Sequence, residues 1–269
     1  MNTTPTNSVL DRVLSDLDAD SAALEAMVAH LDEAGWRTPT PAAGWDIATQ
    51  IAHLAWTDEV AVAAATDKER WDAFVIKALS DPMGYVDVEA LEGGKAAPAD
   101  LLDRWRQARV NLGAALRNYP AGQKMPWFGP PMSPTSMATA RFMETWAHSL
   151  DVAEALGVVP EPSDRIRHVA HIGVRARNFA FAVHSLDAPT EEFRVELRSP
   201  SGELWEWGPA DAAQSVRGPA YDFCLRVTQR RHRDDLDLSA VGPDADRWLD
   251  IAQAFAGPPG SGREAINGG

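Results

Sequence analysis

The stretch Met143-Glu144-Thr145-Trp146-Ala147-His148-Ser149-Leu150-Asp151 combines acidic and imidazole side chains with large apolar ones at helical spacing. Glu144 and His148 are four residues apart, so in a helix their side chains lie one turn apart on the same face, which Asp151 shares. Burying a carboxylate and an imidazole without partners is costly, and a metal ion removes that cost. The stretch therefore predicts a helix that carries metal ligands.

A third ligand must come from another segment of the chain, and His53 is the best candidate. It lies in an amphipathic segment, residues 47–54, and has no acidic or basic neighbour at helical spacing. Taken alone, such a histidine is more often a structural residue than a ligand. Together with the other two side chains, it predicts a metal site formed by His53, Glu144 and His148.

Length, composition and charge limit the class of protein. The chain has 269 residues, of which 45% are hydrophobic and 24% charged, as is ordinary for a soluble globular protein of one or two domains. Its net charge of -14 disfavours non-specific binding to nucleic acid or anionic lipid. No apolar run is long enough to span a bilayer, and the start does not have the pattern of a signal peptide. We expect a cytoplasmic protein with a small-molecule partner and no nucleic-acid or membrane partner; its oligomeric state stays open.

Cys224 is the only cysteine, which excludes an internal disulfide and a cysteine-cluster metal site. It shares an apolar helical stripe with Tyr221 and Leu225, as expected of a small buried hydrophobe. Any thiol chemistry must therefore use a thiol from outside the chain or Cys224 itself.

Helical periodicity predicts four long helices in the N-terminal part of the chain. They are residues 9–34, the segment capped by Asp46, residues 99–116 and residues 133–157. Residues 71–95 are weakly patterned and interrupted by proline and glycine, so we expect short helices and a surface loop there. Four helices joined by loops are typical of an antiparallel bundle, whose interior can hold a metal site.

The C-terminal part mixes helices with short strands. The expected elements are a helix over residues 164–184, a β-hairpin formed by residues 193–197 and 204–207, and two later helices that contain Cys224 and Trp248. The chain is therefore expected to be mainly α. Residues 1–158 would form a four-helix bundle and residues 159–269 a smaller α+β domain.

Two further groups of residues are candidates for binding a ligand. The loop of residues 119–132 is rich in proline, glycine and large apolar side chains, which exposed loops seldom carry. Trp127 and Phe128 in this loop either pack on the bundle or line a cofactor pocket over the metal, and both interpretations stay open. Arg230 and Arg231 lie at a helix end, where cations complement the dipole, and are also candidates for holding an anionic ligand.

Several motifs, in the same order along the chain, resemble those of the DinB-like metal-binding proteins related to the mycothiol-dependent maleylpyruvate isomerases. They are residues 139–157, Gly44-Trp45-Asp46 followed by His53, the loop of residues 126–132, and residues 218–232 and 252–260. The resemblance covers nearly the whole chain. It implies a DinB-like four-helix bundle, followed by a smaller α+β domain, and places the metal triad on His53, Glu144 and His148. From the isomerase relatives it also implies zinc as the usual divalent metal and a low-molecular-weight thiol such as mycothiol as cosubstrate.

The chemistry expected of this triad is catalytic. Two histidines and one carboxylate leave an open position on zinc, whereas structural zinc sites are usually closed by four protein ligands. Coordination favours the thiolate form of a thiol, which is the nucleophilic form. We therefore predict an isomerase or transferase in which a small thiol attacks a small, unsaturated, anionic electrophile. Asp151 is expected to orient a ligating histidine, and Arg230 or Arg231 to hold the substrate carboxylate.

Other interpretations of the triad stay open. The same ligands suit non-haem iron(II), nickel is a third candidate metal, and a metal-activated water could hydrolyse a substrate. The protein could also bind a metal-ligated small molecule without turning it over. Finally, Glu144 and His148 could form an ordinary pair without a metal.

Overall fold

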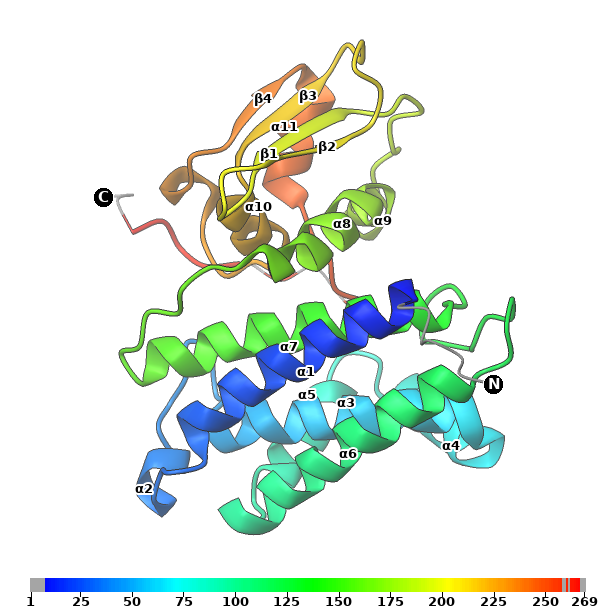
Figure 1. The fold of residues 1–269 in the computed structure, drawn as a ribbon, viewed down its shortest axis with the longest axis vertical. Coiled ribbons are helices and arrows are strands. Elements are labelled where there is room, and N and C mark those ends of the chain that lie inside the picture. The colour runs from blue at the N-terminus through cyan, green and yellow to red at the C-terminus, as the bar shows by residue number, and fades with distance from the viewer. Residues whose placement is uncertain (1–7, 258–259, 261, 267–269) are drawn as a thin grey trace, which may run out of the picture. The chain divides into compact units, whose positions relative to one another are not determined.

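The structure, a computed structural model, describes residues 8–257, 260 and 262–266 (Figure 1). The chain separates into two compact units, Met1–Pro160 and Glu161–Gly269. The first unit is helical, and the second combines helices with a small sheet. The prediction of a mainly α chain with an N-terminal helical bundle and a smaller α+β part is confirmed.

The described residues of the N-terminal unit form seven helices. They are α1 (Val9–Val28), α2 (Glu33–Trp36), α3 (Ile47–Thr66), α4 (Lys68–Ser80), α5 (Tyr85–Gly93), α6 (Pro98–Asn118) and α7 (Pro134–Ala155). The four long helices α1, α3, α6 and α7 form the bundle, in which α3 packs against both α6 and α7, and α1 against α7 (Figure 1). This arrangement places α3 in the middle of the unit, with most of its side chains buried.

Side-chain caps explain where the bundle helices begin. Ser8, Asp46 and Ser133 each accept a hydrogen bond from a backbone N–H in the first turn of α1, α3 and α7. The predicted helix over residues 9–34 is wrong at its end. Asp32 accepts a hydrogen bond from the backbone N–H of Gly35 and so caps a separate short helix, α2, after α1 has ended.

Apolar side chains from all the bundle helices fill the interior around α3. Leu24 of α1, Ile51 of α3 and Trp105 of α6 are fully buried members of the main cluster. A second cluster joins Trp56 of α3 to Trp71 of α4 and to helix α5. The two clusters hold α3 rigidly on several sides, which is what a precise ligand site requires.

The C-terminal unit has four strands and several short helices in its described part. They are η1 (Asp164–Ile166), α8 (Arg167–Arg175), α9 (Arg177–Val183), β1 (Arg194–Arg198), β2 (Leu204–Trp207), β3 (Ser215–Pro219), α10 (Ala220–Val227), η2 (Arg233–Asp235), β4 (Ser239–Val241) and α11 (Pro243–Ile251). The sheet order is β2-β1-β3-β4, with β1 and β3 parallel and the other pairs antiparallel. The expected hairpin is present as β1 and β2, whereas the expected helix over residues 164–184 is divided into η1, α8 and α9.

Strand β3 was not expected, because Gly218 and Pro219 are typical of a turn or a helix start. Gly218 has a φ of +154°, and a Cβ at this position would lie 2.3 Å from the carbonyl oxygen of Asp237. Only glycine therefore allows β3 to lie so close to this neighbouring segment.

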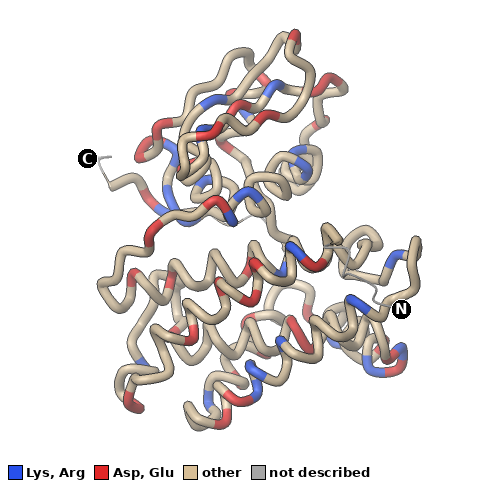
Figure 2. The backbone as a smooth tube through the Cα atoms, viewed as in Figure 1, with Lys and Arg blue, Asp and Glu red and all other residues tan. Residues whose placement is uncertain are grey.

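Charged residues are distributed over both units, with basic side chains interspersed among the more numerous acidic ones (Figure 2). In the bundle, Arg104 of α6 forms two hydrogen bonds with Glu59 of α3, at 2.8 and 2.9 Å. Among the described residues, no helix combines the length and the apolar character that crossing a membrane requires.

Candidate metal centre

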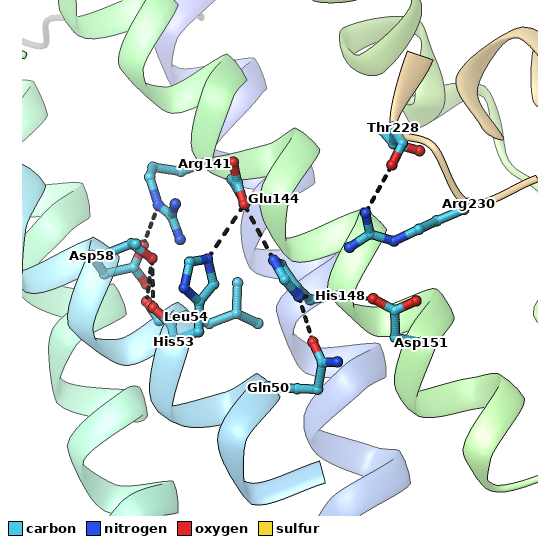
Figure 3. Close-up of polar contacts among 11 residues, drawn as sticks. Gln50, His53, Leu54, Asp58, Arg141, Glu144, His148, Asp151, Thr228 and Arg230 are labelled. Carbon is cyan, nitrogen blue, oxygen red and sulfur yellow. Dashed lines mark hydrogen bonds and ion pairs between the residues drawn. The ribbon is translucent and has the colours of Figure 1, made fainter. Parts of the chain in front are cut away.

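Helices α3 and α7 bring together the three side chains that the sequence suggested as ligands (Figure 3). His53 comes from α3, and Glu144 and His148 lie one turn apart on α7. Glu144 Oε2 lies 3.5 Å from His53 Nε2 and 3.3 Å from His148 Nε2. One potential ligand atom from each residue lies within 4.8 Å of the other two, which is close enough for a shared cation.

His53 provides the test of whether a metal fits this site. Its side chain is 8% exposed, and neither ring nitrogen has a hydrogen-bond partner among the described residues. The 3.5 Å separation from Glu144 is longer than a normal hydrogen bond. A buried imidazole that makes no hydrogen bond is costly, and a cation that accepts its lone pair removes this cost. Two imidazole nitrogens and one carboxylate oxygen are also a donor set that zinc and iron(II) accept, so the residues fit a metal.

Glu144 is the charged member of the triad. Burial by itself would raise the pKa of this carboxyl group, but the contacts with His148 and His53 outweigh burial and hold the pKa well below its ordinary value. The side chain is therefore a carboxylate at neutral pH, which is the form that binds a cation. With 21% of its side chain exposed, Glu144 is also the most accessible of the three residues.

A hydrogen-bonded chain through Gln50 fixes the tautomer of His148. The hydroxyl of Thr40 donates to the carbonyl of Trp45 at 2.9 Å, so its oxygen accepts from Gln50 Nε2 at 2.8 Å. Gln50 then presents its carbonyl oxygen to His148 Nδ1 at 2.5 Å, which requires a proton on Nδ1. In the neutral ring the lone pair of Nε2 is then directed at the Glu144 side, where a metal would lie.

Gln50 takes the hydrogen bond that was expected of Asp151. Asp151 Oδ2 lies 3.9 Å from His148 Nδ1, which is beyond hydrogen-bonding distance, whereas Gln50 Oε1 lies at 2.5 Å. The Asp151 side chain is 2% exposed and places a carboxyl group near the imidazole. A part for Asp151 in the chemistry stays a proposal, but the orientation of His148 is explained by Gln50.

Aromatic rings surround the two imidazoles. Trp45 stacks on His148 with ring centroids 5.9 Å apart, and its ring is tilted against that of His53 at 5.3 Å. Trp56, one turn after His53 on α3, contacts the same imidazole at 6.2 Å. These rings limit the access of water to the histidines and restrict their rotation. Trp45 immediately precedes Asp46, the cap of α3, so the sequence that begins the helix also supplies a wall of the site.

The loop residues Trp127 and Phe128 pack on α4. Their rings lie 6.0 and 5.0 Å from that of Trp71, and Trp127 also packs against the cluster that contains Trp56. Phe128 remains 44% exposed. These contacts correspond to the reading in which the loop packs on the bundle, and a role in binding a cofactor stays a proposal.

The remaining candidates belong to the C-terminal unit. Arg230 and Arg231 follow α10, and Arg230 Nη1 donates to the carbonyl of Thr228 at 2.8 Å (Figure 3). Cys224 within α10 is fully buried, and burial raises the pKa of its thiol well above the ordinary value. A buried thiol that stays protonated is a poor nucleophile, so thiol chemistry at the triad requires a thiol from outside the chain.

Removing the Gln50 amide is expected to weaken metal binding without loss of the triad. Gln50→Ala removes the acceptor that keeps the His148 proton on Nδ1. The ring can then carry its proton on Nε2, so the affinity for zinc should fall about 10–100-fold, as is usual for residues that support a ligand. Competition with a chromophoric chelator measures this affinity. Gln107→Ala, which removes an exposed glutamine of α6, is the matched control and should bind zinc as the wild type does. Equal affinities for the two variants would contradict a role of Gln50 in holding His148.

Comparison with known proteins gives matches over most of the chain. The family model described as the mycothiol maleylpyruvate isomerase N-terminal domain matches residues 17–153, and one described as wyosine base formation matches residues 189–241. Two uncharacterized proteins from two strains of Mycobacterium tuberculosis are each 56% identical over 250 residues, which is 93% of this chain and 97% of theirs.

Solved structures match the chain at lower identity. A crystal structure of the mycothiol-dependent maleylpyruvate isomerase has a TM-score of 0.58 and 16% identity, with 88% of this chain and 96% of that chain covered. A histidine-to-alanine mutant of the isomerase gives a TM-score of 0.57 and 17% identity over the same shares. At this identity the likeness shows a common fold.

Proposed function

Because this chain belongs to the family of the mycothiol maleylpyruvate isomerase N-terminal domain, we propose that it is a metal-dependent enzyme that uses a low-molecular-weight thiol on a small anionic electrophile. The observation that carries the proposal is the convergence of His53, Glu144 and His148, with both ring nitrogens of buried His53 lacking a hydrogen-bond partner among the described residues. Three protein donors would hold a divalent cation and leave it a position for another ligand.

The metal that we propose is zinc, held by the two imidazoles and the Glu144 carboxylate. A free thiol has a pKa of about 8.5, and a bound divalent cation favours the thiolate, which is the nucleophile. The protein sets the protonation of the two proposed ligands on α7. Glu144 is ionised, and Gln50 keeps the proton of His148 on Nδ1. The rings of Trp45 and Trp56 limit access of competing water to the histidines.

The proposed reaction begins with attack of the thiolate on an unsaturated carbon conjugated to a carbonyl group. A carbon–sulfur bond forms, and the π electron pair moves to the carbonyl oxygen. Rotation about the new single bond and expulsion of the thiolate then restore the double bond with the other geometry, so the thiol is regenerated. If the adduct is instead protonated and released, the same first step gives S-transfer. In either case we propose that Arg230 or Arg231 holds a carboxylate of the substrate.

Turnover should require both the thiol and the metal. We expect the protein to isomerise maleylpyruvate, or to form a stable mycothiol adduct with it, only when mycothiol is present. Removal of the metal with a chelator should abolish turnover, and added zinc should restore it. Product analysis by mass spectrometry separates isomerisation from S-transfer. Turnover that persists without thiol, or in metal-free protein, would contradict the proposal, while tight binding without any product would favour a non-catalytic binding protein.

A second candidate keeps the triad and changes the metal. Two histidines and one carboxylate are also the usual donors of non-haem iron(II), which supports oxidative chemistry. Elemental analysis of protein purified without oxygen distinguishes the two candidates, because an iron content near one atom per chain and no zinc would favour the iron enzyme. Zinc at that stoichiometry would favour the thiol-dependent reaction.

A further inference from the structure

Asp58 of α3 and Arg141 of α7 form an ion pair in the interior of the bundle. Arg141 Nε donates to Asp58 Oδ1 at 2.7 Å, and the two side chains are only 2% and 4% exposed. Three polar contacts cross from α3 to α7 in antiparallel order: Gln50 with His148, His53 with Glu144, and Asp58 with Arg141 (Figure 3). The ion pair therefore lies on one side of the ligand contact and Gln50 on the other.

The stability of the fold does not explain why this pair is present. Burial raises the pKa of Asp58 even though the charge and hydrogen bond of Arg141 oppose the rise, so the carboxylate is less stable here than in water. Arg141 Nη2 is also buried and has no hydrogen-bond partner among the described residues. Buried ion pairs of this kind are often no more stabilising than well-packed apolar side chains of similar volume.

The two histidines of the triad are held in different ways. His148 is oriented by its hydrogen bond to Gln50, but His53 has no such bond among the described residues and is held by packing against aromatic rings. The distance from His53 to Glu144 therefore depends on how α3 lies along α7. Apolar contacts permit small shifts between helices, whereas a charge-assisted hydrogen bond with a fixed direction opposes them.

We propose that the Asp58–Arg141 pair is a positioning device for the metal site. It fixes α3 against α7 so that His53 lies at ligand distance from Glu144, and thereby sets the affinity and the coordination geometry of the metal. The inference rests on the proposed metal triad, and assigns to Asp58 and Arg141 a role that acts through the ligands without contact with the substrate.

The test replaces the pair with apolar residues of similar volume. In the double variant Asp58→Leu/Arg141→Met, the metal-free protein should melt at the same temperature as the wild type or higher. Its affinity for zinc should nevertheless be weaker by about 10–100-fold, and the visible spectrum of the cobalt(II)-substituted protein should change. A merely structural pair would give the opposite pattern, with a lower melting temperature and an unchanged cobalt spectrum.

A matched control is available at the next residue of α3. Glu59 pairs with Arg104 of α6 on another face of the helix. The double variant Glu59→Leu/Arg104→Met removes an interhelical ion pair of similar size and should leave the zinc affinity and the cobalt spectrum unchanged.

The outcomes separate this inference from the proposed function. Wild-type protein that binds no metal would contradict both, whereas wild-type affinity and spectrum in the Asp58→Leu/Arg141→Met variant would overturn only the positioning role. Should that variant fail to fold, Arg141→Lys tests the positioning role instead, because lysine keeps the charge but not the fixed direction of the guanidinium. A weaker zinc affinity at an unchanged melting temperature then supports the inference, and an unchanged affinity contradicts it.

Discussion

Replacing His148 with alanine is expected to abolish stoichiometric zinc binding and thiol-dependent turnover together. The substitution removes one of the three donor atoms and leaves only the Glu144 carboxylate and the His53 imidazole. Catalytic zinc sites use three protein ligands, so two donors are not enough to hold the metal. The loss of affinity should be at least about tenfold greater than the roughly 10–100-fold expected for a supporting residue such as Gln50. Isothermal titration with zinc, followed by the mycothiol and maleylpyruvate assay, measures both effects.

The control for this variant is a histidine of the same unit outside the site. His30 is exposed in the turn that follows α1, and its ring contacts the carbonyl of Ala26. His30→Ala should bind zinc and turn over substrate as the wild type does. If His148→Ala retained thiol-dependent turnover, the triad would not be the catalytic centre.

Removing Asp58 alone should destabilise the bundle strongly. Asp58→Ala leaves the buried guanidinium of Arg141 without its carboxylate, and an uncompensated buried charge costs about 3–5 kcal/mol in the free energy of unfolding. Urea unfolding of the metal-free protein measures this change. Asp72→Ala, which removes an exposed acid of α4, should change the free energy by no more than about 0.5 kcal/mol.

The stability of Asp58→Ala is best compared with that of the apolar double variant. The single variant keeps the charge of Arg141 without a partner, whereas Asp58→Leu/Arg141→Met removes both charges. A stable single variant would mean that Arg141 finds another partner and that the pair does not hold the two helices. Equal destabilisation of the single and double variants would mean that the pair contributes to stability itself.

The candidate triad could be inferred from the sequence because two of its members lie on one helix. A spacing of four residues fixes the relative positions of Glu144 and His148 as soon as the segment is helical. His53 needed the additional signal of a second amphipathic segment. Gln50 could not be found in this way, since an uncharged amide on a helix has many possible partners. Only the alignment of α3 along α7 shows that its carbonyl faces His148.

The fold was predictable where local signals decide it. Periodicity indicated α3, α6 and α7, and the caps Asp46 and Ser133 indicated where α3 and α7 begin, because both signals depend on residues within a few turns. The parallel pairing of β1 with β3 joins separate segments of the chain, so local signals do not predict it. Strand β3 also contains Gly218 and Pro219, which are typical of turns, so the sequence did not indicate a strand there. For Trp127, the sequence indicated an apolar loop but not its neighbour, which is Trp71 of α4.

The most direct measurement is anomalous X-ray diffraction at the zinc edge from crystals of the zinc-loaded protein. The predicted result is one strong peak between His53 Nε2, Glu144 Oε2 and His148 Nε2, with the remaining coordination supplied by solvent or an added thiol. A peak elsewhere in the molecule, no peak, or a fourth protein ligand that closes the site would contradict a catalytic metal centre at this triad.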